Sequence, residues 1–449
     1  MEEITKKNAR AILVGLDITS EKNALSSWDI DSSLDELERL ASTADVDVVC
    51  RLTQRLALPD TRSFIGSGKV KELKTLLEAH EVQLLIFDDE LSPRQQVNLQ
   101  NDLSEEDALE EDRVQVMDRT ALILDIFASH ATTREGKLQV ELATVQYEMP
   151  RLRGKWSHLE AEKLGGGVGA RFGMGESQLE ADRRLLGKRM SDLKREIKRV
   201  AVERETQRSK RMASGIFKVS LVGYTNAGKS TLLNALTDAN VLAYDKLFAT
   251  LDSTTRNLAL TSGREITLTD TVGFINKLPH GLVDAFKSTL EEVNQADMLL
   301  HVVDASSDNA EGQITAVEEV LREIGAIDKP TLLVFNKIDN VCEEGEQRLE
   351  RFKELYPGCE MISAHKKQGL EELLLAIERY AAKSATLMDV LIPFTRGELV
   401  QLAHTRTTIV EESHIAEGTR MTLRVPKDLV GQFNPFAQEQ SKHSDSSVG

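Results

Sequence analysis

Short apolar runs alternate with helical patterns over the first part of the chain. An apolar run is expected to form a buried strand, and a spacing of three to four residues between apolar positions is typical of a helix. Strands are predicted at 11–18, 46–52 and 82–89, and helices at 32–44 and after Gly68. Strands that alternate with helices favour a parallel sheet. We therefore expect a small N-terminal α/β domain over residues 1–130.

A longer helical pattern begins after residue 119 and runs toward Pro150. A second one covers 176–211, where apolar positions three or four residues apart are separated by charged residues, as in an amphipathic helix. These positions are Leu179, Leu186, Met190, Leu193, Ile197 and Val200. We predict a helical hairpin between this helix and one over about 134–149, within a linker at 131–214. A single linker helix is the alternative.

The expected tip of the hairpin is rich in glycine. Six glycines fall between Gly165 and Gly175, within a loop at 164–177. So much glycine disfavours a helix and indicates either a flexible connector or a loop that approaches another backbone closely. Trp156 and Phe172 nearby can stack on bases. Lys155, Lys163 and Arg171 are therefore candidate RNA contacts.

The pattern changes near residue 215 to a second α/β unit, which we place at 215–383. Short alternating runs after it predict a small sheet-containing C-terminal domain at 384–436. From 437 to 449 the chain is rich in Ser and Gln, and we predict a disordered tail.

Charge is distributed unevenly along the 449 residues. The net charge is −17, which by itself disfavours a polyanionic partner, yet residues 151–212 hold 17 Lys/Arg against 9 Asp/Glu. A polyanion should therefore meet the middle of the chain. Three scattered cysteines argue against a disulfide framework, and neither a signal peptide nor a long apolar span is evident. We expect a cytoplasmic protein without membrane insertion.

The strongest chemical signal is GYTNAGKS at 223–230, which follows an apolar run and precedes a helical pattern. This is the phosphate-binding P-loop in the context that it requires. Gly223 and Gly228 let the backbone amides point at phosphate. Lys229 should reach the β- and γ-phosphates, and the Ser230 hydroxyl should bind Mg²⁺.

Two further motifs end predicted strands downstream. Asp270 and Gly273 form a DxxG sequence, in which the aspartate would hold magnesium through water and the glycine amide would sense the γ-phosphate. Asn336, Lys337 and Asp339 form NKxD. The carboxylate of Asp339 can accept two donors from the guanine edge, which adenine does not offer. The motif therefore favours GTP over ATP.

The segment at 245–256 should order on GTP, with a threonine that binds Mg²⁺. We choose Thr250, and Thr254 is the second candidate. The complete set of candidate GTP-binding residues is Gly223, Tyr224, Thr225, Asn226, Ala227, Gly228, Lys229, Ser230, Phe248, Ala249, Thr250, Leu251, Asp252, Asp270, Thr271, Val272, Gly273, Asn336, Lys337, Ile338, Asp339, Ser363, Ala364 and His365. The candidate metal ligands are Ser230 and Thr250, with Mg²⁺ as the cofactor.

No catalytic residue can be assigned. Ras-like proteins carry a water-positioning glutamine after the DxxG glycine, whereas this chain has Phe274, whose ring cannot orient water. Intrinsic hydrolysis should be slow and completed by a partner. The GSGK sequence at 66–69 superficially resembles a second phosphate loop, but Val70 stands where Ser or Thr is needed.

Together these motifs resemble the HflX-type GTPases, a branch of the translation-factor-related P-loop GTPases. The resemblance also includes FIGSGKVKEL at 64–73 and the sequence at 118–143. It implies a GTPase domain preceded by a small α/β domain and a helical hairpin, with a small α+β C-terminal part. It further implies binding to the large ribosomal subunit and a role in splitting or rescuing stalled ribosomes under stress.

Two departures from that family are visible. The glycine-rich segment lacks the proline that the family usually has there, which loosens the loop, and His365 replaces a frequent lysine. A GTP-dependent adaptor that controls a protein partner such as a protease is the alternative function. We expect the free protein to be monomeric.

Overall fold

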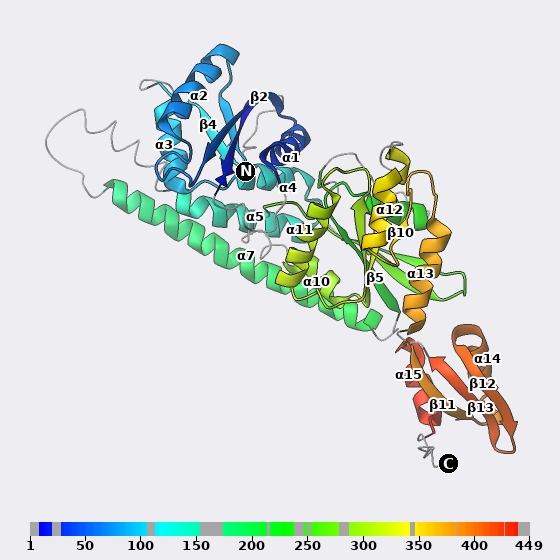
Figure 1. Cartoon of the computed structure of the whole chain (residues 1–449). Coiled ribbons are helices and arrows are strands. Elements are labelled where there is room, and N and C mark those ends of the chain that lie inside the picture. Colours follow the sequence, from blue (N-terminus) through cyan, green and yellow to red (C-terminus); the bar gives the residue numbers. More distant parts are fainter. Residues whose placement is uncertain are drawn as a thin grey trace, which may run out of the picture.

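The computed structural model describes residues 9–19, 28–105, 113–152, 174–212, 216–237, 247–248, 253–277, 287–341, 346–383, 385–425 and 427–438. Four parts follow one another along the chain: an α/β domain, a pair of long helices, a second α/β domain and a small α+β domain (Figure 1). Within the described residues, no helix is long and apolar enough to cross a bilayer.

The N-terminal domain has a parallel sheet, as predicted, and its four strands lie in the order β2-β1-β3-β4. Its strands are β1 (Arg10–Ile18), β2 (Asp47–Leu56), β3 (Leu84–Phe87) and β4 (Gln115–Asp118), and its helices are α1 (Ile30–Thr43), α2 (Ser67–His80), α3 (Pro93–Leu103) and α4 (Arg119–His130). Successive side chains of a strand point to opposite faces. Leu13 therefore packs with α1 and α4, whereas Val14 packs with α2 and α3.

The helical pattern predicted to run from residue 119 toward Pro150 is interrupted. α4 ends at His130, and α5 (Arg134–Glu148) begins after Thr133, whose hydroxyl accepts a hydrogen bond from the amide of Gly136 at 3.0 Å. A threonine in this position satisfies an otherwise unpaired amide of the first helical turn. The chain therefore starts a new helix at this point. A short 3-10 turn, η2 (Met149–Arg151), follows α5.

The predicted helical hairpin is present. α5 packs antiparallel to α7 (Met174–Met212), and Leu193 of α7 is fully buried beside Leu142 and Val145 of α5. Arg189 forms an ion pair with Glu141 at 2.6 Å across the two helices. In Figure 1, α7 runs from beneath the N-terminal domain to the second α/β domain.

One prediction about the glycine-rich loop needs correction. We placed the loop at 164–177, whereas α7 already begins at Met174 and includes Gly175. A single glycine costs a helix roughly 1 kcal/mol, which a helix of 39 residues can absorb. Residues 164–173 lie outside the described part of the chain.

The second α/β domain has a six-stranded sheet in the order β10-β9-β8-β5-β7-β6, in which β6 alone runs antiparallel to its neighbour. The strands are β5 (Phe217–Gly223), β6 (Thr254–Ala259), β7 (Glu265–Asp270), β8 (Met298–Asp304), β9 (Thr331–Asn336) and β10 (Glu360–Met361). The helices are α8 (Lys229–Thr237), α10 (Lys287–Gln295), α11 (Ala310–Glu323), α12 (Glu346–Leu355) and α13 (Leu370–Lys383), with the 3-10 turn η3 (Ile338–Asn340). Apolar residues of α8 and α13 cover one face of the sheet, and those of α10 and α11 cover the other.

The C-terminal domain is a three-stranded antiparallel sheet in the order β11-β13-β12. Its elements are β11 (Thr386–Ile392), η5 (Phe394–Arg396), α14 (Gly397–Arg406), β12 (Thr408–Ile415), β13 (Gly418–Val425), α15 (Lys427–Phe433) and η6 (Asn434–Phe436). We predicted a disordered tail from 437, but the amide of Gln438 donates a hydrogen bond to the carbonyl of Asp389 in β11 at 2.8 Å. The ordered part of this domain therefore extends at least to Gln438.

Candidate nucleotide site

The predicted P-loop forms the turn between β5 and α8. Gly223 and Gly228 have φ angles of +151° and +92°, which L side chains rarely adopt. A Cβ atom on Gly223 would lie 2.2 Å from the carbonyl oxygen of Val302 in β8, and one on Gly228 would lie 2.2 Å from the side-chain amide of Asn336. Both positions therefore require glycine for conformation and for space.

Lys229 is the first residue of α8 and is buried. Its ammonium donates hydrogen bonds to the carbonyls of Gly223 at 3.1 Å and Tyr224 at 2.9 Å, which hold the side chain across the loop. Burial lowers the pKa of Lys229 to about 8, although Asp270 opposes this shift. A buried cation is unfavourable without anionic partners, and phosphate oxygens would supply such partners.

Ser230, a predicted magnesium ligand, lies next to Asp270, which is expected to hold the ion through water. The Ser230 hydroxyl donates a hydrogen bond to the carboxylate of Asp270 at 2.6 Å, and Asp270 is fully buried at the end of β7. Hydroxyl and carboxylate oxygens are ligands that Mg²⁺ prefers. The residues present therefore fit a magnesium ion. Among the described residues no cluster of three or more His, Cys, Asp or Glu side chains is suited to a metal.

The DxxG segment packs directly against the P-loop. The amide of Thr225 donates a hydrogen bond to the carbonyl of Phe274 at 2.7 Å. A Cβ atom on Gly273 would lie 2.8 Å from the Cα of Thr225 and 3.0 Å from the ammonium of Lys229. The Thr271 hydroxyl donates to the carbonyl of Leu221 at 2.6 Å, so this predicted nucleotide contact uses its side chain to tie β7 to β5.

Asn336 joins three loops at the expected guanine end. Its side-chain oxygen accepts a hydrogen bond from the amide of Ala364 at 2.9 Å, and its side-chain nitrogen donates to the carbonyl of Ala227 at 2.9 Å. Lys337 pairs with Asp304 at 2.8 Å. Asp304 was not among the predicted residues, although it ends β8 directly beside the strand that carries NKxD, because neighbouring parallel strands end at the same edge of the sheet.

Asp339 lies in η3, beside the predicted Ser363-Ala364-His365 segment. A hydrogen bond from the Ser363 hydroxyl lowers the pKa of Asp339, which keeps this carboxylate ionised and able to accept hydrogen bonds. Lys366 approaches Asp339 to 4.0 Å. Ser363 and Ala364 are buried, whereas His365 is exposed. The loops that follow β5, β7 and β9 therefore meet at one edge of the sheet.

Several predicted residues are not brought to this edge by the described structure. Ala249, Thr250, Leu251 and Asp252, and the candidate RNA contacts Lys155, Lys163 and Arg171, lie outside the described residues. The Phe248 ring packs against Phe127 of α4, with ring centroids 4.5 Å apart, so its side chain belongs to the contact between the two domains. Thr254, our second candidate for the magnesium-binding threonine, begins β6 opposite Asp270.

Phe274 occupies the position of the water-orienting glutamine, and its side chain is 2% exposed. It packs in an apolar cluster that both α/β domains share. The ring therefore takes no part in positioning a water molecule in this arrangement.

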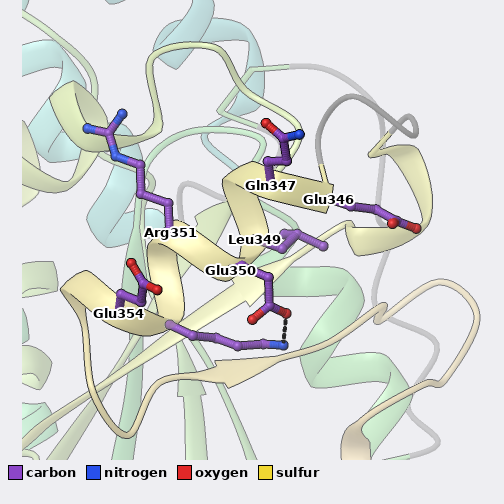
Figure 2. Close-up of a pocket in the computed structure, with 7 residues that line it drawn as sticks. Glu346, Gln347, Leu349, Glu350, Arg351 and Glu354 are labelled. Atoms are coloured by element: carbon purple, nitrogen blue, oxygen red, sulfur yellow. Dashed lines mark hydrogen bonds and ion pairs between the residues drawn. The ribbon is translucent and has the colours of Figure 1, made fainter.

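A hollow of about 610 Å³ lies on the second α/β domain (Figure 2). Residues of α12 line it, between Glu346 and Glu354, and an ion pair of 2.7 Å joins Lys353 to Glu350. None of the predicted nucleotide contacts lines this hollow.

A parallel sheet with a P-loop after β5, a DxxG loop after β7 and an NKxD loop after β9 defines a P-loop GTPase. Three family models match the chain: a GTP-binding GTPase N-terminal region at 31–128, a GTP-binding GTPase middle region at 130–211 and a 50S ribosome-binding GTPase at 218–337.

Curated relatives cover nearly the full length of the chain. The GTPase HflX of Caldanaerobacter subterraneus subsp. tengcongensis is 43% identical over 97% of this chain and 95% of its own. That of Escherichia coli is 41% identical over 94% of both chains. A GTP-binding protein from the archaeon Sulfolobus solfataricus, solved with GDP, is 26% identical over 84% of this chain and 99% of its own, with a TM-score of 0.40. The chain belongs to the HflX family of GTPases and hydrolyses GTP.

Proposed function

We propose that this GTPase binds the large ribosomal subunit in its GTP form and splits or rescues stalled ribosomes under stress. The supporting observation is the exposed side of α7. Between residues 180 and 202, every Lys and Arg of this helix is exposed, whereas Leu193 and its apolar neighbours face α5. Arg184, Lys188, Arg195 and Arg199 follow one another along a single stripe, because residues four and seven apart share a helix face.

A basic stripe of this kind suits the phosphates of ribosomal RNA, since Lys and Arg neutralise phosphate charge and release counterions. Lys155, Lys163 and Arg171 precede this helix in the sequence and lie outside the described residues, and we propose them as further RNA contacts. A matched family model is described as a 50S ribosome-binding GTPase, which supports the same partner.

With nucleotide bound, Lys229 would hold the β- and γ-phosphates, and Asp339 would accept the guanine N–H donors. Ser230 would hold Mg²⁺, with Thr250 as the proposed second protein ligand and Asp270 acting through water. A bound Mg²⁺ would supply neutralisation of the charge that develops on the phosphates. Because Phe274 cannot orient water, the hydrolytic arrangement would be completed when the ribosome binds.

The test is co-sedimentation of the purified chain with large ribosomal subunits. We expect binding with a non-hydrolysable GTP analogue and much weaker binding with GDP. Equal binding with both nucleotides, or no binding, would contradict the proposal.

A charge variant makes the test specific. The double variant Lys188→Ala, Arg199→Ala should weaken binding to the large subunit. The slope of the logarithm of the binding constant against the logarithm of the salt concentration should become shallower by roughly one unit for each lost phosphate contact. The matched control is Arg351→Ala, Lys353→Ala on α12, which removes two basic residues of the second α/β domain. If both double variants bind alike with unchanged salt dependence, the adaptor function toward a protein partner becomes the better explanation.

A further inference from the structure

The N-terminal domain gathers an acidic cluster, Glu36, Asp88 and Asp89, at the end of its sheet where α/β domains commonly bind ligands. In its sheet, β1 lies between β2 and β3. After β1 the chain forms β2 on one side of it and then crosses over to form β3 on the other side. In open α/β sheets ligands bind at such a switch point, outside the carboxyl ends of the strands. Asp88 and Asp89 directly follow β3 there, and Glu36 of α1 lies beside them, within one network of ion pairs and hydrogen bonds.

The second α/β domain contributes Lys277 to this acidic cluster. The Lys277 ammonium lies 2.6 Å from the carboxylate of Asp88 and also pairs with Asp89. Arg119 of α4 pairs with Asp88 at 2.6 Å and with Glu36. The N-terminal domain thus contributes three carboxyl groups and one guanidinium, and Lys277 is the second cation. Burial would raise the pKa of Asp88, but Arg119 and Lys277 outweigh burial and lower it.

A second contact joins the same acidic cluster to the P-loop. The hydroxyl of Tyr224, in the P-loop, donates a hydrogen bond to Glu36 and accepts one from the amide of Asn276. The Tyr224 side chain is 4% exposed and stacks on Trp28 of the N-terminal domain, with ring centroids 5.8 Å apart. One hydroxyl therefore connects the P-loop, the segment after DxxG and the N-terminal domain.

These contacts restrain the loop that must meet the γ-phosphate. Asn276 and Lys277 are three and four residues beyond Gly273, which lies beside Lys229. Phe274 is bonded to the P-loop on both sides, since its amide donates to the carbonyl of Gly223 at 3.1 Å and its carbonyl accepts from Thr225. The N-terminal domain therefore holds Asn276 and Lys277. These residues end a short segment that begins at Gly273, beside the expected position of the phosphates.

We propose that Glu36, Asp88 and Asp89 are positioning residues for GTP, because they hold Tyr224 and Lys277 and so pre-organise the DxxG loop for the γ-phosphate. Pre-organisation lowers the cost of ordering a loop on binding. GDP lacks the phosphate that this loop meets, so the contact favours GTP over GDP. By reciprocity, GTP should strengthen the docking of the N-terminal domain. The inference rests on the proposed nucleotide site and not on ribosome binding.

The experiment measures the dissociation constants of the full chain for GDP and for a non-hydrolysable GTP analogue, both with Mg²⁺. In Lys277→Ala and in Tyr224→Phe, the preference for the GTP analogue over GDP should fall at least about fivefold, the lower end of typical coupling between sites. Lys277→Arg keeps the cation and should restore much of the preference.

Two control variants remove similar contacts elsewhere. Tyr147→Phe deletes a tyrosine hydroxyl that donates to Asp118 at 3.0 Å within the N-terminal part, and Lys353→Ala deletes a lysine ion pair on α12. Both should keep the wild-type preference. An unchanged preference in Lys277→Ala and Tyr224→Phe, or a shift toward the GTP analogue, would overturn the proposal.

Hydrogen exchange gives a readout that is independent of affinity. Amides of α1 and β3 should be better protected with the GTP analogue than with GDP, and this difference should vanish in Lys277→Ala. Identical protection in wild type with both nucleotides would also overturn the proposal. A wild-type chain that binds neither nucleotide would overturn the nucleotide site as well, whereas loss of ribosome binding alone would leave this inference intact.

Discussion

Lys229 is both buried and positively charged, and burial is unfavourable for a charge. Burial lowers the pKa of Lys229 to about 8. Near neutral pH most molecules therefore carry a charged Lys229, but this ammonium loses its proton more readily than that of an exposed lysine. The carbonyls of Gly223 and Tyr224 offset part of the cost of burial. Phosphate oxygens would offset more, which explains why a buried cation is kept where anions are to bind.

Asp339 gives the sharpest prediction at the residue scale. Asp339→Asn should lower GTP affinity by about a hundredfold or more, since a site that loses a partner for buried donors discriminates strongly. Affinity for xanthosine triphosphate should rise, because the amide can donate to the xanthine carbonyl that replaces the guanine amino group. Competition binding with both nucleotides measures this exchange.

The control for this substitution is Asp308→Asn, whose side chain is 95% exposed and pairs with Arg348. It should leave both affinities unchanged. Retention of GTP affinity by Asp339→Asn would contradict the assignment of the guanine contact.

At the scale of elements, the hairpin depends on a narrow apolar seam between α5 and α7. Leu193 is fully buried in this seam, whereas Leu185 on the same helix is 64% exposed. Leu193→Ala should destabilise the packing of α7 by about 2–5 kcal/mol, which is the usual cost of removing a buried leucine side chain. Hydrogen exchange of α5 and α7 amides measures the loss.

Leu185→Ala is the matched control, because it makes the same chemical change on the exposed side of α7. It should change the free energy of opening, measured by hydrogen exchange of the α5 and α7 amides, by less than about 0.5 kcal/mol. Equal effects of the two substitutions would contradict an apolar contact between α5 and α7. A single linker helix would then be the better description of this region.

At the scale of the whole molecule, the two α/β domains share one apolar cluster that includes Phe127, Phe248 and Phe274. This cluster keeps the Phe274 ring away from the position of an attacking water. We predict slow turnover of GTP by the free chain and at least tenfold faster turnover with large ribosomal subunits, well within the stimulation known for partner-assisted GTPases. Phosphate release with and without subunits measures the difference.

Small ribosomal subunits serve as the control for this effect and should not accelerate hydrolysis. Turnover by the free chain that matches turnover with large subunits would show that the hydrolytic arrangement is already complete without a partner.

The amino-acid sequence by itself determined the chemistry of the nucleotide site and the order of the domains. Phosphate, magnesium and guanine each require particular residue types at a particular spacing. The motifs that meet these requirements can therefore be recognised from the sequence alone, at Gly223–Ser230, Asp270–Gly273 and Asn336–Asp339. The hairpin was predictable as well, since one face of each helix needs a partner to bury its apolar residues.

Only the tertiary structure decided how the domains meet. Glu36, Asp88 and Lys277 are far apart in the sequence, and none belongs to a recognisable motif, so their pairing depends on the packing of one domain against the other. The burial of Phe248 and Phe274 between the domains likewise has no local signal. Local patterns specify strands, helices and ligand loops, whereas contacts between domains arise from surface complementarity that a single sequence does not display.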